Sequence, residues 1–480
     1  MPDIKKVVVG QPAAYLIDPH VWVDSRAIVS IRFAIYESLV KYDRNARNVP
    51  GLAVGWQLAG DARTWTFHIR PGVHFHDGSV LTAGDAAASL HRAVSPDMPG
   101  EYGTSALLSL YLKDAEIKAL DDLTLQIITP QPLADLLDLL LYAAIIPARY
   151  IDQVTKTVPG TGPYCVGEEK ENEVILNRFE DYWGGPSPVE ELVFRAIGTP
   201  EQRIQAFLDG EVDLITYMPI ESVEEFAGNP AAYPIERDTT FCVIIMFNAQ
   251  KGACKDPRIR QALNYAADVD EIVREVAHGK AYRMNGPLSP FHTAADPDLQ
   301  PYPHDLDKAV RLLKEAGYPD GINLTMHRPT SSPTESAELA AILIQQWKKA
   351  GISIEEKVFE NRVEYALMVR GKNIADMGVF DSSPLSSYRV LREKLHSGFT
   401  GPWWQGYHNP QVNQLMEKAW ATPDEVERTG IYQQAYRIIS EDASWLFLYC
   451  PKDLWVVRTS LKEALPDWEP GLSGLVLFGQ

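Results

Sequence analysis

The sequence predicts an α/β fold built from more than one domain, and three observations lead to this prediction. Segments with helical periodicity and segments with strand periodicity alternate along most of the chain. The 480 residues exceed the size of one common hydrophobic core, so two or three domains are expected. Apolar residues make up 45% of the chain, which is ordinary for a globular protein.

The first clear elements lie near the N-terminus. Residues 65–70 alternate apolar and polar side chains, which predicts a half-buried strand. The turn pairs at 71–72 and 77–78 extend this prediction to a hairpin. Thr82 is suited to cap a helix, with Asp85 at the third helical position, where backbone N–H groups favour a carboxylate.

Two further helices are predicted in the second half of the chain, each followed by a strand. The first runs from Asp305 to a stop at Gly317. The second is expected to have Ser332 as its cap, Pro333 at its first position and Gly351 just beyond its end. This helix–strand repetition supports the α/β prediction.

The net charge of −19 argues against nucleic acids and anionic membrane surfaces as partners. No run of about 18 apolar residues occurs, and the most apolar stretch, 133–148, contains two aspartates and suits a buried helix. The first six residues contain no apolar segment typical of a secretory signal. If the protein is exported, we expect the sequence to begin at the mature N-terminus after an added Met1; a cytoplasmic protein is the alternative.

Short motifs recur in a fixed order along the chain. The N-terminal ones are YESLV at 36–40, LA at 52–53, Trp56, WTFHIRPGVHFHDGS at 65–79 and LTAGD at 81–85. The later ones are GTGPY at 160–164, LNR at 176–178, DYWGG at 181–185, FLDGEVDLI at 207–215, FN at 247–248, RIRQAL at 258–263, NP at 409–410 and EDA at 441–443. Together they resemble the motifs of the family 5 (peptide, oligopeptide and nickel-type) extracellular solute-binding proteins of ABC importers, over almost the whole chain.

This resemblance implies a two-lobed, class II periplasmic-binding-protein-like fold. Lobe I would comprise residues 1–242 and 456–480, with an insert subdomain at 45–160, and lobe II would comprise 243–455. Two crossover strands, 243–247 and 448–457, would join the lobes, and the ligand cleft would lie between them. The resemblance further implies a periplasmic monomer that delivers its solute to an ABC transporter permease in the membrane, without catalysis.

Rival functions find little support in the motifs. His74 and His76 lie two positions apart on a predicted strand and so face one side, and Asp77 follows, which would suit a metal. However, residues 76–78 resemble the scaffold turn of the family, and no further ligand lies nearby in sequence. The chain has no nucleophile elbow, no HExxH helix and no set of kinase motifs, so we predict no enzyme activity. We expect no cofactor and no bound metal of the protein's own.

Aromatic residues are the main candidates for the ligand pocket. Trp403 and Trp404 are adjacent in a loop rich in turn residues, and on an extended chain adjacent side chains point in opposite directions. One tryptophan is therefore expected to pack inward and the other to stack on a ligand, unless both belong to the core. The resemblance to the family further implies that Trp22 lines the cleft from lobe I and that Tyr102 lines it from the insert.

Phe380 and Asp381 lie in a segment that resembles a pocket segment of the family. In its peptide-binding members an aspartate there pairs with the amino terminus of the ligand. This sequence departs from the pattern, because the segment is one residue short. A short peptide is the predicted ligand. A sugar, sugar conjugate or opine-like compound is the alternative, and a nickel or metal chelate is a weaker one.

Four cysteines are too few for a disulfide framework. Cys242 and Cys450 both lie in apolar, strand-like runs near the expected lobe junction. They are either spatial neighbours or two separate buried thiols.

Overall fold

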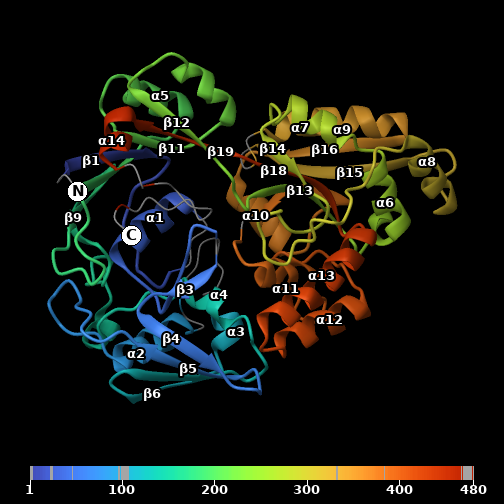
Figure 1. The fold of residues 1–480 in the computed structure, drawn as a ribbon. Helices are drawn as coiled ribbons and strands as arrows, with labels where there is room; N and C mark the ends of the chain where they lie inside the picture. The colour runs from blue at the N-terminus through green and yellow to red at the C-terminus, as the bar shows by residue number, and fades with distance from the viewer. Residues whose placement is uncertain are drawn as a thin grey trace. The chain divides into compact units, whose positions relative to one another are not determined.

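The computed structural model describes residues 4–21, 25–45, 47–95, 98, 108–330, 333, 335–382, 384–465, 468 and 478. The chain forms two compact units: unit 1 is Met1–Arg237 with Asp453–Gln480, and unit 2 is Asp238–Lys452. The chain thus enters unit 2 after Arg237 and returns to unit 1 after Lys452 (Figure 1). The strand expected to make the first crossing, 243–247, lies inside unit 2. None of the described helices has the length and apolar character needed to cross a bilayer.

Unit 1 is built on a seven-stranded sheet. Its strands, in spatial order, are β12 (Ala232–Arg237), β19 (Asp453–Arg458), β11 (Leu214–Met218), β1 (Ile4–Gln11), β10 (Val189–Ala196), β9 (Glu173–Arg178) and β8 (Tyr164–Glu169). The remaining described elements outside residues 53–153 are α1 (Arg26–Ile35), β2 (Val40–Tyr42), β3 (Asn48–Pro50), α5 (Pro200–Leu208), η3 (Ile220–Phe226) and α14 (Thr459–Ala464). Strand β1 runs parallel to β10 and β11, whereas β19, the first strand after the chain returns, pairs antiparallel with β11 and β12.

Both faces of this sheet are buried, and strand periodicity explains how. Along β1, Val7 and Val9 belong to one hydrophobic cluster and Val8 belongs to another. Along β19, Trp455 belongs to the first cluster and Val456 to the second. Successive side chains of a strand point to opposite faces, so a continuous apolar run supplies both clusters at once.

The segment expected as an insert contains a separate four-stranded sheet. Its strands, in spatial order, are β4 (Ala53–Leu58), β5 (Thr64–Ile69), β7 (Thr124–Ile128) and β6 (Glu116–Asp121). The helices of this region are α2 (Ala83–Ala93), α3 (Ser109–Leu112), α4 (Leu136–Leu140) and η2 (Ala148–Gln153). In Figure 1, β4, β5 and β6 lie together with α2 beside them.

Two local predictions for this region are confirmed, whereas the hairpin is wrong and the helix expected at 133–148 is reduced to the five residues of α4, Leu136–Leu140. Thr82 caps α2 in a capping box with Asp85, and 65–69 forms most of β5. However, β5 pairs with β4 and β7 rather than with residues 73–80, which form one isolated bridge between His74 and Val80. Two long-range partners already occupy both edges of β5, so the predicted hairpin was wrong.

Unit 2 is built on a six-stranded sheet. Its strands, in spatial order, are β14 (Ala281–Arg283), β18 (Trp445–Pro451), β13 (Cys242–Phe247), β17 (Met377–Ser382), β15 (Ile322–Pro329) and β16 (Ile352–Phe359). Its helices are η4 (Ala253–Lys255), α6 (Pro257–Tyr265), α7 (Val269–Glu275), α8 (Leu306–Glu315), α9 (Ser336–Lys349), α10 (Arg362–Arg370), α11 (Ser387–Leu395), α12 (Pro410–Trp420) and α13 (Glu425–Glu441). Helices α12 and α13 pack side by side (Figure 1).

The two helices predicted for this unit are present, with one corrected start. Helix α8 follows Asp305, whose side chain caps it, and Gly317 lies just beyond its end with a φ of 96°. Helix α9 ends before Gly351, as expected, but begins at Ser336 rather than Pro333. The Ser336 hydroxyl donates to Pro329 O at 2.7 Å, which holds this residue against the end of β15. Ser332 lies outside the described residues.

Two of the sequence motifs meet around Glu37, directly after α1. The Glu37 side chain is 2% exposed and lies 2.5 Å from Lys41 Nζ. It accepts hydrogen bonds from the Tyr182 hydroxyl at 2.9 Å and the Trp183 indole N–H at 2.7 Å. The motifs at 36–40 and 181–185 are therefore two halves of one buried polar contact.

Two other motifs meet through His76. The His76 ring donates from Nε2 to Gly162 O at 3.0 Å, and Nδ1 accepts the Gly160 N–H at 3.3 Å. Gly160 and Gly162 in turn lie against the carbonyl groups of Ala34 and Ile35 at the end of α1. The GTGPY segment is therefore packed between the HFHDG segment and the end of α1 in unit 1.

His20 and His292 are held neutral by the same kind of arrangement. His20 lies between Ala144 O at Nε2 and Arg92 at Nδ1, at 2.8 and 2.7 Å. His292 lies between Pro384 O at Nε2 and Ser289 N at Nδ1, at 2.8 and 3.0 Å. Because Nδ1 accepts a hydrogen bond in both, a second ring proton has no place, and burial lowers the pKa of each histidine to about 4.

We expect the free energy of unfolding to fall as the pH drops from 6.5 towards 4. In the unfolded chain these histidines titrate near 6.5, so in this window the unfolded state binds more protons. Each histidine should contribute a loss of about 3 kcal/mol across the window, as measured by urea denaturation at several pH values. The variant H292N should lose stability less steeply, while H68N, at an exposed position of β5, should retain the wild-type slope. An unchanged slope in H292N would contradict the prediction.

Candidate functional site

The site begins on β17, which carries two of the predicted ligand residues. Phe380 and Asp381 pair with Ile244 and Val243 of β13, so the position of their backbone is fixed by the sheet of unit 2. Both side chains are half-buried, although the preceding residues of the strand, 377–379, are fully buried. The strand therefore emerges from the core just where these two side chains begin.

Basic side chains of unit 2 surround Asp381. Arg362, the first residue of α10, places Nη2 4.0 Å from the Asp381 carboxylate. Lys394 of α11 is fully buried and donates to the Ser382 hydroxyl at 2.8 Å. Burial lowers the pKa of Lys394 to about 8, against the opposing attraction of Asp381. At neutral pH Lys394 is charged, so Asp381 faces two cations of its own protein.

A buried ion pair lies next to Lys394 on the same helix. Arg389 Nε donates to Glu393 Oε1 at 2.8 Å, with side chains that are 7% and 3% exposed. Together with Asp381, Arg362 and Lys394, this makes a group of three cations and two carboxylates. The group carries one positive charge in excess, which favours an anionic partner.

An aromatic surface adjoins the charged group. The Trp403 ring lies 5.2 Å from the Phe380 ring, and the Phe380 ring lies 6.5 Å from that of Tyr365. Lys394 Nζ is 5.8 Å from the centre of the Phe380 ring. Flat aromatic faces beside charged groups suit a ligand that has both an apolar surface and ionised ends.

The loop that carries the two tryptophans is anchored at several points. Lys372 Nζ donates to Gly401 O and Pro402 O, at 2.7 and 2.8 Å. The side-chain amide of Gln405 donates to Val369 O at 2.8 Å, and the backbone carbonyl of Gln405 accepts from Ala249 N. These contacts hold the loop against the end of α10 and the segment that follows β13, so the backbone around Trp403 is anchored at several points.

The two tryptophans differ from the prediction in detail. Both are half-buried, and neither belongs to the hydrophobic core. Residues 402–403 form a turn, so the alternation expected for an extended chain does not apply. The indole N–H of Trp404 donates to Tyr407 O at 2.8 Å, so this donor already has a hydrogen-bond partner within its own loop.

The structure therefore brings together Phe380, Asp381 and Trp403 of the predicted site residues, with Trp404 in the same loop. Trp22 and Tyr102 lie outside the described residues. Sequence reasoning missed Arg362, Lys372 and Lys394. Their sequence surroundings are ordinary helix ends and charged helix faces, so no local signal marks them.

The candidate metal ligands at 74–77 serve the scaffold instead. Both ring nitrogens of His76 bond to backbone groups of Gly160 and Gly162. Asp77 accepts from the Ser79 hydroxyl at 2.6 Å and pairs with Arg149, while His74 is exposed. Among the described residues, no group of three or more histidine, cysteine or acidic side chains is arranged to hold a metal ion.

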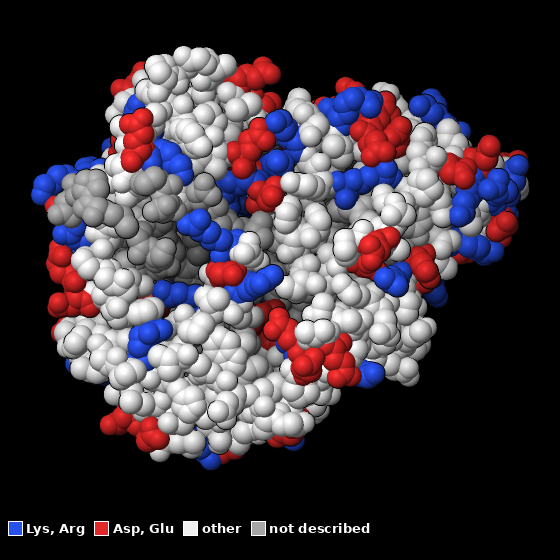
Figure 2. All heavy atoms as spheres, in the orientation of Figure 1, with Lys and Arg blue, Asp and Glu red and all other residues white. Residues whose placement is uncertain are grey.

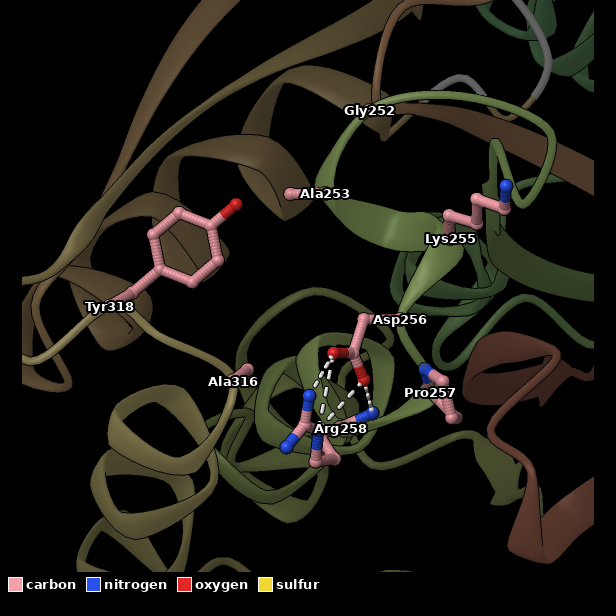
Figure 3. A pocket seen from close by; sticks show the side chains of 8 residues that line it. All are labelled: Gly252, Ala253, Lys255, Asp256, Pro257, Arg258, Ala316 and Tyr318. Atoms are coloured by element: carbon pink, nitrogen blue, oxygen red, sulfur yellow. Dashed lines mark hydrogen bonds and ion pairs between the residues drawn. The ribbon is translucent and has the colours of Figure 1, made fainter.

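A hollow of about 540 Å³ lies on unit 2 between the start of α6 and the end of α8 (Figure 3). Two of its charged side chains are already paired, because Asp256 and Arg258 point at each other with Nη2 and Oδ2 2.6 Å apart. Arg258 also donates to Glu315 O at 2.6 Å. None of the predicted ligand residues lines this hollow.

The surface charge shows no single dominant patch on the face seen in Figure 2. Acidic and basic side chains of unit 2 are interspersed there, although the chain as a whole carries a net charge of −19. The charges that distinguish the candidate site are thus the local ones around Asp381.

Residues 47–399 match the model of the bacterial extracellular solute-binding proteins, family 5. Among curated proteins, the glutathione-binding protein of Pectobacterium atrosepticum is 27% identical over 449 residues, covering 90% of this chain and 86% of that protein.

Two solved structures share the two-lobed fold of periplasmic binding proteins. The periplasmic binding protein DppA of Helicobacter pylori, in complex with the peptide STSA, has a TM-score of 0.81 and 24% identity, covering 100% of this chain and 97% of that one. The binding protein AgaA of A. tumefaciens R10, in complex with agropinic acid, has a TM-score of 0.78 and 22% identity, covering 95% of this chain and 93% of that one.

Proposed function

The chain belongs to the bacterial extracellular solute-binding proteins of family 5, and from this premise we propose that it captures a short peptide between its two lobes and delivers it to an ABC importer permease. The match to the family over 47–399 carries this proposal. The protein would act outside the cytoplasm, as a monomer, and without catalysis.

The candidate site on unit 2 supports a ligand with ionised ends. We propose that Phe380 and Trp403 contact apolar parts of the ligand and that Asp381 receives its ammonium group. Trp404, Trp22 and Tyr102 complete the proposed set of ligand residues. Peptide recognition in this class of site uses main-chain hydrogen bonds, so few side chains need to be specialised.

A second candidate ligand is an opine-like or sugar-derived acid. The excess positive charge around Asp381 favours it, because Arg362 and Lys394 already face that carboxylate. A ligand carboxylate would then meet Arg362, and its sugar-like face would stack on Trp403. The solved relative with agropinic acid supports this candidate.

A thermal-shift screen of the full chain separates the ligand classes. It should include di- to pentapeptides, glutathione, agropinic acid, neutral oligosaccharides and a nickel chelate. We expect a peptide to raise the melting temperature, because a ligand that binds the folded state stabilises it by mass action. A rise with agropinic acid and none with any peptide would support the second candidate and contradict the first.

Substitutions at Asp381 and Arg362 then test the site itself, with titration calorimetry as the measurement. If a peptide ammonium meets Asp381, D381N should weaken binding by about 30- to 1000-fold, since a buried charge loses its partner. If a ligand carboxylate meets Arg362 instead, R362Q should weaken binding more than D381N does. The matched control is D270N, because the side chain of Asp270 is 72% exposed in unit 2. Full affinity in both D381N and R362Q would remove the site from consideration.

A further inference from the structure

Cys242 and Cys450 face each other across two neighbouring strands of unit 2. Val243 of β13 pairs antiparallel with Tyr449 of β18, so the next position on each strand brings the two cysteines opposite each other. Their sulfur atoms are 2.8 Å apart, and the residues are 1% and 0% exposed. Directly opposed residues of an antiparallel pair have the Cα separation that a disulfide bond needs.

Contacts other than the sulfurs also hold this corner together. The Thr239 hydroxyl donates to Pro451 O at 2.9 Å, and Lys452 Nζ lies 3.8 Å from Asp238 Oδ1. These residues are where the chain enters and leaves unit 2. The backbone around Cys242 and Cys450 is therefore positioned by its own hydrogen bonds and strand pairing.

We propose that Cys242 and Cys450 form a disulfide bond that clasps unit 2 at its entry and exit. The bond would join the first and last long strands of the unit and close a loop spanning 208 positions. Cys165, which lies in unit 1, and Cys254, buried at η4, stay as thiols.

The oxidant in this proposal is a low-molecular-weight disulfide, RSSR. The thiolate of one cysteine attacks RSSR, forms a mixed disulfide and releases one RS⁻. The thiolate of the other cysteine attacks the protein sulfur of that mixed disulfide, forms the Cys242–Cys450 bond and releases the second RS⁻. The two protons lost by the cysteines yield two RSH, so the protein is oxidised and RSSR is reduced.

Burial dictates when this exchange occurs. Burial raises the pKa of the Cys242 thiol, so the folded unit presents almost no thiolate to an oxidant. The bond thus forms while unit 2 folds, and once formed it is shielded from reduction. An extracytoplasmic location permits such a bond, but the proposal stands on the strand register and does not depend on the ligand.

The test refolds the full chain with glutathione disulfide, traps free thiols with iodoacetamide in denaturant and maps unreduced peptides by mass spectrometry. Two of the four cysteines, Cys165 and Cys254, should be alkylated, and one linked peptide should contain Cys242 and Cys450. The oxidised protein should melt about 5–15 °C higher than the reduced protein, because the loop closure restricts the unfolded chain.

Two double variants serve as controls. C165S/C254S should keep the linked peptide and the redox-dependent melting shift, whereas C242S/C450S should lose both. Alkylation of all four cysteines after oxidative refolding would overturn the proposal, and so would a linked peptide that involves Cys165 or Cys254. Equal melting temperatures of the oxidised and reduced protein would contradict the proposal that this disulfide bond stabilises unit 2.

Discussion

Replacing Glu37 with alanine is expected to lower the free energy of unfolding by about 3–5 kcal/mol. The Glu37 carboxylate is buried and accepts from the Tyr182 hydroxyl and the Trp183 indole, at 2.9 and 2.7 Å. It also lies 2.5 Å from Lys41 Nζ. Alanine would leave the buried Tyr182 hydroxyl, the half-buried Trp183 indole N–H and the half-buried Lys41 ammonium without the carboxylate that all three contact, which costs far more than one ordinary hydrogen bond. Urea denaturation monitored by tryptophan fluorescence measures this decrease in the free energy of unfolding.

Two variants show whether burial is the cause. Glu37→Gln keeps the shape and one acceptor oxygen, so its loss should be smaller than that of Glu37→Ala. Glu190→Ala also removes a glutamate that contacts a lysine, at 2.8 Å, but that Lys5 side chain is 84% exposed. This exposed pair should contribute less than about 1 kcal/mol. Equal effects of Glu37→Ala and Glu190→Ala would contradict the prediction.

Replacing Gly160 with alanine is expected to destabilise unit 1 by about 3 kcal/mol or more. A Cβ atom at this position would lie 2.0 Å from Ile35 O and 2.8 Å from Tyr36 Cδ1. The obstacle at 2.0 Å is a backbone oxygen at the end of α1, which also accepts from Gly162 N at 2.9 Å, so it cannot rotate away. The segment around Gly160 must move away from the end of α1, and the hydrogen bonds of His76 with residues 160 and 162 would weaken as a result.

The matched control is Gly198→Ala in the same unit. A Cβ atom at Gly198 would meet no atom within 4 Å, so the free energy of unfolding should change by less than about 0.5 kcal/mol. Urea denaturation of both variants makes the comparison. If Gly160→Ala were as stable as Gly198→Ala, the packing of the GTGPY segment against α1 would be wrong.

Local patterns predicted much of the scaffold, and the misses have physical causes. The capping box of Thr82 and Asp85 was predictable because it involves residues three positions apart. The hairpin at 65–80 was wrong because the partners of β5 come from β4 and β7, which turn signals do not reveal. The start of α9 was wrong because Ser336 is held by Pro329 of β15.

The candidate site was only partly predictable. Phe380, Asp381 and Trp403 were identifiable by residue type and by resemblance to the family. Arg362 and Lys394 were not, since a cation on a helix is usually solvated and only its contact with Asp381 or Ser382 makes it notable.

By itself, the sequence determined the α/β class, the membership in family 5 and the caps of α2 and α8, because periodicity, capping and short motifs each depend on residues close together in the chain. Only the tertiary structure decided the cations around Asp381, the meeting of Glu37 with Tyr182 and the opposition of Cys242 to Cys450. These contacts join residues that are distant in sequence, and strand order and register bring them together. A one-residue shift of register would turn Cys242 away from Cys450, so no local pattern could have specified that pair.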